Sequence, residues 1–260
     1  MCIRDSYFGW EAPEFVHLPL ILNKERGKLS KRHGAVAVEE FRDRGYLPQA
    51  LLNFIALLGW NPGDDREVLS LEEMVDEFRF ERVSKSGAVF DREKLNWMNQ
   101  QYLLKLPEEE YFRMIDDVIQ KGDYHDQDPG KIRQAAEILK TRLVTLSDLN
   151  QKLGLFFEEN PEIKDLQAIE VLKEDNSKTV LKEFLQQAEN LDQLTSENLG
   201  QLVKSVQKTT GIKGRGLWMP LRCAITREVS GPELPAMLDF FGGEKCLHLI
   251  RQTLENPSLN

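Results

Sequence analysis

The segment from Asn23 to Gly34 reads Asn-Lys-Glu-Arg-Gly-Lys-Leu-Ser-Lys-Arg-His-Gly, and its centre is the pentapeptide Lys-Leu-Ser-Lys-Arg at residues 28–32. Two lysines, Lys28 and Lys31, flank a serine hydroxyl, and a glycine lies on each side of the motif. Such a cationic loop can close over a triphosphate and stabilise the charge that builds on a leaving pyrophosphate. By residue type alone, a basic loop beside a glycine is more often a solvated turn. The rest of the sequence is needed to choose between a phosphate-binding loop and a solvated turn.

The composition is that of a multi-domain protein. The chain has 260 residues, 41% of them hydrophobic, which suits two or three compact domains. It contains no run of about 18 apolar residues and no early apolar core of a secretory signal, so we expect a cytoplasmic protein with no membrane partner. The three cysteines, Cys2, Cys223 and Cys246, lie far apart without a zinc-ligand spacing, which predicts buried or idle thiols and no metal site.

The net charge of −9 argues against a general nucleic-acid binder, because polyphosphate attracts basic surfaces. The basic residues are unevenly placed, however, and a protein can bind RNA through basic faces while its other side stays acidic. One basic group is Lys24, Arg26, Lys28, Lys31, Arg32 and His33, and a second is Lys204, Lys208, Lys213, Arg215, Arg222 and Arg227. Composition alone favours neither RNA contact nor an ordinary solvated surface.

From Leu47 onward the hydrophobic spacing predicts helices. Pro48 suits the first turn of a helix that ends at Gly59, and Ser70 with Glu73 forms a capping box for a helix to about Phe78. A short strand is expected at 88–90, a helix capped by Asp91 after it, another opened by Pro107, and a surface loop at 123–130. Further helices are expected near 131–143, 147–155, 176–189, 196–209, 216–228 and 232–254, the last broken at Gly242-Gly243.

The pentapeptide at 28–32 resembles the KMSKS-type signature of class I aminoacyl-tRNA synthetases, in the KLSKRHG form of the bacterial glutamyl-tRNA synthetases. Other segments resemble the same family in the same order, and the resemblance covers nearly the whole chain from Tyr7. Ordered motifs are far more specific than one motif. They are Phe15–Leu22, which is similar to the strand leading into the loop, Asn53–Asp65, Phe90–Asn99, Lys213–Arg222 and Gly231–Leu234.

The resemblance implies a mainly α fold in four parts. Residues 1–32 would be the residual end of a Rossmann-like catalytic nucleotide-binding domain with the KLSKR loop, and 33–107 a small α/β stem-contact domain. Residues 108–165 and 166–260 would be two all-helical anticodon-binding domains. The glutaminyl branch ends in β-barrels and a stand-alone queuosine-modifying relative lacks the tail, so the helical pattern favours the glutamyl branch.

The activity implied by the resemblance is ATP-dependent attachment of glutamate to tRNA(Glu) through a glutamyl-adenylate. Position by position, Lys28, Ser30 and Lys31 carry over as catalytic residues, and Lys28, Lys31 and Arg32 as ATP-binding residues, with Lys31 as the phosphate contact. Mg²⁺ would accompany ATP as part of the substrate, without a protein-bound metal. The expected partners are tRNA(Glu), ATP and L-glutamate, and the protein is expected to be a monomer. The expected tRNA contacts are Lys213, Arg215, Trp218 and Arg222.

Several of these residues have a structural interpretation beside the functional one. Trp60 and Trp97 are expected to be core anchors, whereas Trp218 lies among basic residues where an exposed ring could stack on an unpaired base. His33 is expected to be a phosphate neighbour or loop residue. Asp64 and Asp65 are expected to shape a turn.

The family's HIGH-type signature, its glutamate pocket and the insertion that receives the tRNA 3′ end are absent from the sequence. The first six residues, Met1 to Ser6, depart from the family pattern and are expected to be a spurious start on a truncated sequence. We therefore expect a fragment that is inactive alone. Two alternatives remain open: a non-catalytic tRNA-binding module, and an acidic helical scaffold without an RNA role.

Overall fold

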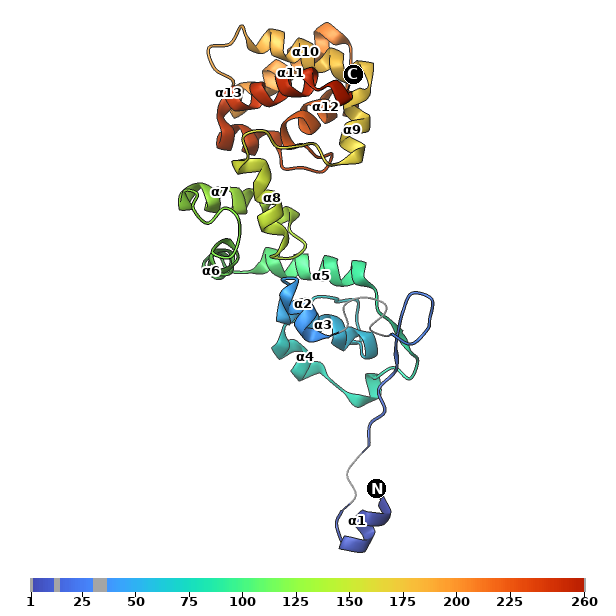
Figure 1. Cartoon of the computed structure of the whole chain (residues 1–260). Helices are drawn as coiled ribbons and strands as arrows, with labels where there is room; N and C mark the ends of the chain where they lie inside the picture. The colour runs from blue at the N-terminus through green and yellow to red at the C-terminus, as the bar shows by residue number, and fades with distance from the viewer. Residues whose placement is uncertain (1, 12–14, 30–36, 260) are drawn as a thin grey trace. The chain divides into compact units, whose positions relative to one another are not determined.

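A computed structural model of the chain describes residues 2–11, 15–29 and 37–259. It divides into two compact units, Met1–Tyr102 and Leu103–Asn260 (Figure 1). Nearly all of the regular structure is helical, which confirms the mainly α fold. In the described part of the chain, no helix is both long enough and apolar enough to cross a membrane. The finer division into four domains stays a prediction.

The first unit combines helices with one small sheet. Strands β1 (Ile21–Leu22) and β2 (Ala88–Val89) pair in parallel, with Ile21 opposite Ala88. The helices are α1 (Cys2–Phe8), α2 (Val38–Asp43), α3 (Pro48–Gly59), α4 (Leu71–Glu77), the 3-10 turn η2 (Phe80–Arg82) and α5 (Arg92–Lys105), which continues past the end of the unit.

The core of this unit lies where α2, α3 and α5 meet. Its buried members are Phe41, Tyr46, Leu51, Phe54, Leu95 and Met98. A fully buried amide, Asn53, links α3 to the chain that enters α4. Its Oδ1 accepts a hydrogen bond from the backbone N–H of Leu69 at 2.9 Å and lies 2.9 Å from the hydroxyl of Tyr102. Because buried polar groups need partners, this amide fixes the register of three segments at once.

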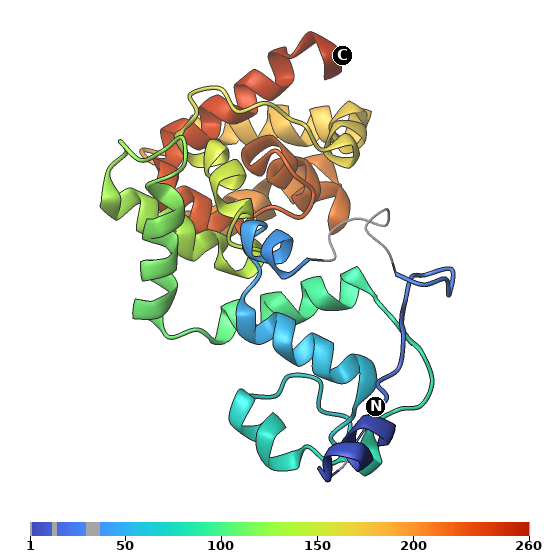
Figure 2. The ribbon, with the colours of Figure 1, turned by 60° about the horizontal axis from the view of Figure 1, so that its bottom comes forward.

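The second unit is entirely helical in its regular structure (green to red in Figure 2). A first group consists of α6 (Glu108–Ile119), α7 (Pro129–Leu139), η3 (Lys140–Arg142) and α8 (Asp148–Phe157). A second group consists of α9 (Leu166–Lys173), α10 (Asp175–Ala188), α11 (Ser196–Thr210), α12 (Arg215–Thr226), α13 (Leu234–Glu255) and η4 (Pro257–Leu259). Helix α10 packs against α11 and α12, and α13 packs against α11, α12 and α7.

Short-range interactions set several of the helix ends. The capping box of Ser70 and Glu73 is formed at α4, as predicted. Asp91 Oδ1 accepts from the backbone N–H of Glu93 at 3.0 Å at the start of α5. Gly242 has φ 75° and ψ 162°, which confirms the predicted break in α13.

Other predictions about elements were wrong. The strand expected from residues 15–22 exists only at Ile21–Leu22. Helix α7 begins at Pro129 rather than near 131, because Asp128 accepts from the backbone N–H of Lys131 and proline suits the first turn. Helices α2 and α9 were not predicted at all. Helix α9 is separated from α10 only by Glu174, and the helix predicted near 176–189 corresponds to α10 alone.

Candidate nucleic-acid interface

The KLSKR motif begins on a tight hairpin. The backbone N–H of Asn23 donates to the carbonyl of Gly27 at 2.8 Å, and that of Leu29 donates to the carbonyl of Ile21 at 3.1 Å. Gly27 N–H also donates to Asn23 Oδ1 at 2.6 Å. This hairpin presents Lys28 to solvent at the end of β1. Ser30, Lys31 and Arg32, the remaining predicted catalytic or ATP-binding residues, lie outside the described residues, as does His33.

The predicted tRNA contacts gather on one face of α12. Gly214, with φ 58°, turns the chain into the helix, and the helix starts at Arg215. Arg215, Trp218 and Arg222 follow at spacings of three and four residues, so they share the outer face. Leu217, Leu221 and Ala224, which are spaced in the same way, are buried. The Trp218 ring is 43% exposed, which leaves it available for stacking. Lys213 is exposed just before the helix.

One carboxylate joins Arg222 to an arginine that sequence analysis missed. Glu233 Oε2 lies 2.9 Å from Arg222 Nη2, and Glu233 Oε1 lies 3.6 Å from Arg142 Nη2. Arg142 ends η3 in the first helical group, whereas Arg222 lies on α12 in the second. We call Arg142, Glu233 and Arg222 the bridged arginine pair. It places two guanidinium groups from different helical groups on either side of one carboxylate.

The position of Glu233 favours its charge. It is the residue before α13, where the unpaired N–H groups of the helix start attract an anion. Its side chain is 67% exposed, so the bridge is accessible from solvent. The only sequence feature that indicated Glu233 was the Gly-Pro-Glu-Leu segment at 231–234. No motif near Arg142 indicated a functional role for that residue.

A cavity of about 420 Å³ adjoins the bridged arginine pair through Arg142 and Pro232. Its lining carries both signs of charge, including Lys152, which lies 3.8 Å from Glu228, and Asp165. Asp165 Oδ2 accepts from the backbone N–H of Val229 at 2.9 Å, which holds the segment between α12 and α13 in place. The cavity can therefore hydrogen-bond both donors and acceptors of a polar ligand.

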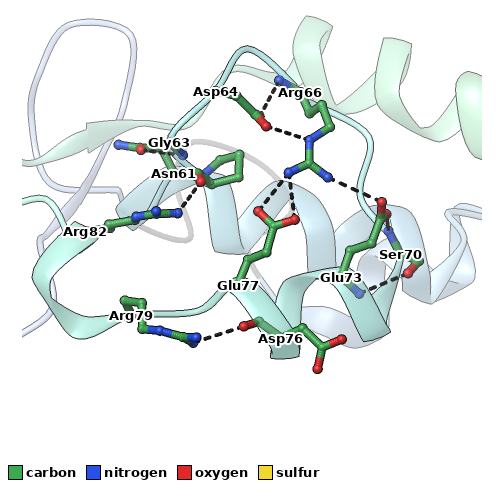
Figure 3. Close-up of polar contacts among 11 residues, drawn as sticks. Asn61, Gly63, Asp64, Arg66, Ser70, Glu73, Asp76, Glu77, Arg79 and Arg82 are labelled. Atoms are coloured by element: carbon green, nitrogen blue, oxygen red, sulfur yellow. Dashed lines mark hydrogen bonds and ion pairs between the residues drawn. The ribbon is translucent and has the colours of Figure 1, made fainter.

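The densest charge cluster in the first unit has a structural role (Figure 3). Arg66 Nε lies 2.8 Å from Asp64 Oδ2, and Arg66 Nη2 lies 2.6 Å from Glu77 Oε1. These bonds raise the pKa of Arg66, chiefly through the hydrogen bond to Glu77, and hydrogen bonding from Arg66 lowers the pKa of Asp64. All three guanidinium nitrogens have carboxylate partners, since Arg66 Nη1 reaches Glu73 at 3.4 Å. The cluster ties the turn at 61–66 to α4, as expected for Asp64.

The two tryptophans predicted to be core anchors, Trp60 and Trp97, differ in burial. Trp60 is buried at 4% exposure, as predicted, but Trp97 is 42% exposed, so its prediction as a core anchor was wrong. The inner face of α5 is set by Leu95 and Met98, and Trp97 lies between them in sequence on a different face of the helix. Cys223 and Cys246 are buried free thiols, and the side chain of Cys2 lies outside the described residues. The described residues contain no cluster of metal-binding side chains.

Comparison with known proteins agrees with these features. A family model described as the anticodon binding domain matches residues 98–254, and one for the catalytic domain of class I tRNA synthetases (E and Q) matches residues 3–97. The glutamate–tRNA ligase of Clostridioides difficile (strain 630) is 38% identical over 255 residues, which are 96% of this chain and 52% of that protein. The glutamate–tRNA ligase of Listeria monocytogenes serovar 1/2a is 40% identical over an aligned length of 264 residues, gaps included, and this alignment covers 96% of this chain and 52% of that protein.

A solved structure shows the same likeness. The crystal structure of a glutamate tRNA ligase from Elizabethkingia meningosepticum, in complex with its amino acid, superposes with a TM-score of 0.71 at 29% identity, over 98% of this chain and 54% of that one. The chain thus spans about half the length of the curated relatives it matches. Because the family model covers more than half of its residues, the chain belongs to the anticodon binding domain family and is a relative of the bacterial glutamate–tRNA ligases.

Proposed function

We propose that this protein serves the ATP-dependent attachment of glutamate to tRNA(Glu), and that its second unit binds the anticodon arm. The observation that carries the anticodon role is the bridged arginine pair beside the exposed Trp218 on α12. Unpaired bases are read by stacking on aromatic or guanidinium planes and by hydrogen bonds to their edges. This face offers both kinds of contact.

Different residues of this face would supply affinity for RNA and selectivity between bases. Lys213 and Arg215 are exposed cations at the start of α12, and we propose that they contact phosphates. Arg222 is half-buried and held by Glu233, so its donors point in a defined direction and suit a base edge. Trp218 supplies a stacking surface. Arg142 belongs to the same reading surface, although it comes from the first helical group.

We further propose that the KLSKR segment takes part in adenylate formation. Lys28 and Lys31, with Ser30 and Arg32, would contact the phosphates of ATP, which carries Mg²⁺ as its own counter-ion. L-glutamate and the tRNA 3′ end would complete the substrates. The protein would act as a monomer in the cytoplasm, where tRNA is charged. The 260-residue chain by itself would not form the adenylate, because Lys31 acts only when a complete pocket positions the reactants.

The test of the anticodon role is the affinity of the chain for a glutamate tRNA and for anticodon-swapped variants at several salt concentrations. Lys213→Ala should weaken binding to all of them alike and reduce the salt slope by about one unit or less. Trp218→Ala should instead narrow the gap between cognate and swapped anticodons. Equal affinity of the unaltered chain for every anticodon would remove the reading role.

The test of the catalytic role is glutamate-dependent exchange between ATP and pyrophosphate. Anticodon-selective binding without exchange by the chain would support the non-catalytic tRNA-binding module as the description of these 260 residues. Glutamate-dependent exchange by the purified chain, free of host enzyme, would show that our proposal of inactivity is wrong.

A further inference from the structure

Arg227 occupies an unusual place at the end of α12. It closes the helix with φ 63° and ψ 4°, a left-handed conformation in which glycine is the usual residue. Despite its charge and its strained backbone, the residue is only 6% exposed. A buried arginine in a position that favours glycine suggests a functional role for its guanidinium.

The charge of Arg227 has no compensating carboxylate among the described residues. Its Nη1 donates to Thr253 Oγ1 at 2.8 Å and its Nη2 to Gln252 Oε1 at 3.1 Å, both neutral acceptors. Its Nε–H is buried and has no acceptor in the described part of the chain. Burial lowers the pKa of this guanidinium to about 10. Buried charges are normally paired, and Arg227 has no anionic partner among the described residues.

A cavity lies beside this guanidinium. It has a volume of about 510 Å³ and is lined by Arg227, the end of α13, the 160–163 segment and η4. Neutral hydrogen-bonding groups dominate its wall, namely the side chains of Asn160, Gln252, Asn256 and Ser258. Gln252 is held in position by a hydrogen bond to Asn160. Two carboxylates, Glu162 and Glu255, also line it, and neither lies within ion-pair distance of Arg227.

We propose that this cavity binds a small oxyanion, a carboxylate or a phosphate group, with the Arg227 guanidinium as its counter-charge and the NH₂ groups of the neutral amides as further donors. A guanidinium fits the planar fork of a carboxylate and the oxygens of a phosphate. The amide NH₂ groups of Asn160, Gln252 and Asn256 would donate to the remaining oxygens. Neither Trp218 nor the bridged arginine pair lines this cavity, although Arg227 and Glu162 also line the 420 Å³ cavity that adjoins Arg142.

The experiment titrates the full chain with inorganic phosphate, and in parallel with acetate, by isothermal calorimetry in a chloride background of constant ionic strength. We expect one site with millimolar affinity for at least one probe, and the stronger probe identifies the class of oxyanion. Two variants test the location. Arg227→Gln removes the counter-charge, and Asn256→Asp adds a negative charge to the wall. Each should weaken binding at least tenfold.

Asn256→Asp is a second variant that should keep the native fold, so a loss of binding in it cannot be attributed to unfolding. Asn256 Oδ1 accepts from the backbone N–H of Ser258 at 3.0 Å and from its hydroxyl at 2.8 Å, and aspartate can accept both bonds. The matched control is Arg251→Gln on α13, because Arg251 is half-exposed and lies near Glu189 at 4.0 Å. It should change affinity less than twofold.

Thermal unfolding supplies an independent reading, because phosphate stabilises most proteins without binding. A rise in Tm that is larger in the unaltered chain than in Arg227→Gln and Asn256→Asp supports the site. Equal rises in all four proteins, with no heat of binding, overturn it. If the unaltered chain shows no binding but the Glu162→Gln or Glu255→Gln variant binds the probe, the proposal is also overturned, since an internal carboxylate would then be the partner of Arg227.

Discussion

Replacing Glu233 by glutamine tests the bridged arginine pair most directly. The two carboxylate oxygens serve different arginines, Oε2 facing Arg222 at 2.9 Å and Oε1 facing Arg142 at 3.6 Å. Glutamine has the same shape but only one acceptor oxygen. It can hold one arginine, and its NH₂ group then faces the other. Glu233→Gln therefore releases one guanidinium while leaving the backbone and the start of α13 unchanged.

The expected cost in stability is small. The Glu233 side chain is 67% exposed, and exposed ion pairs contribute about 0–1 kcal/mol to the free energy of unfolding. The effect on RNA recognition should be larger. A well-oriented bidentate contact discriminates between bases by about 1–3 kcal/mol, which corresponds to roughly 5-fold to 150-fold in affinity. We expect the variant to lose selectivity within this range.

The released cation should also gain a phosphate contact. Each phosphate neutralised on a single strand adds about 0.7 to the slope of log affinity against log salt. Glu233→Gln should thus bind every tRNA more tightly at low salt, with a steeper salt dependence and poorer choice between anticodons. Fluorescence anisotropy with labelled cognate and anticodon-swapped tRNAs measures all three quantities.

The matched control is Glu228→Gln. It removes the same charge from the same segment, but its partner is Lys152 at 3.8 Å rather than an arginine of the bridged pair. It should steepen the salt dependence slightly and leave anticodon selectivity unchanged. If Glu233→Gln kept full selectivity with an unchanged slope, or behaved like Glu228→Gln, the bridge would have no part in reading RNA.

Three further predictions concern the core, the thiols and the KLSKR loop. Asn53→Leu leaves the buried N–H of Leu69 without an acceptor, so it should lower the free energy of unfolding of the first unit by about 1–3 kcal/mol, measured by urea titration. An unchanged midpoint of urea unfolding would contradict the role of this amide. Burial raises the pKa of Cys223 and Cys246 to about 12, so above about pH 9 the folded protein keeps thiol protons that the unfolded chain releases. The Tm should therefore fall as the pH rises from about 9 towards 12. This fall should be less steep in a variant with both cysteines replaced by alanine. Lys31→Ala, placed in a protein with a complete catalytic domain, should raise the barrier to adenylate formation by about 2.7–4 kcal/mol in pre-steady-state assays, and a loss of tRNA affinity instead would assign Lys31 to RNA.

Local chemistry explains why many elements could be predicted from sequence. The capping box at Ser70 depends on residues three apart, and the break at Gly242 depends on one residue without a side chain. Helix α3 starts at a proline whose fixed backbone suits a first turn. In each case the interaction that ends or starts the element lies within one helical turn, so the sequence contains it.

Contacts between distant segments could not be predicted in this way. Arg142 and Glu233 meet only because the first helical group packs beside the start of α13, and no spacing rule relates residues so far apart in sequence. Trp97 shows the same limit on one helix: a large aromatic ring is usually buried, but its angular position on α5 was decided by Leu95 and Met98. The sequence places Arg227 in the second basic group but does not reveal that this residue is buried.

The net charge of −9 becomes intelligible once the partners of the basic residues are known. An acidic chain gains little affinity from long-range attraction between its net charge and phosphate, so positive charge over the whole molecule is not its means of holding RNA. Its alternative is to use few cations and to orient them. Glu233 does this for Arg142 and Arg222, at the cost of part of their charge. Under our proposal, Lys213 and Arg215, which stay exposed, draw in the phosphates, and the bridged arginines contribute direction. Selectivity between anticodons should therefore resist added salt better than affinity does.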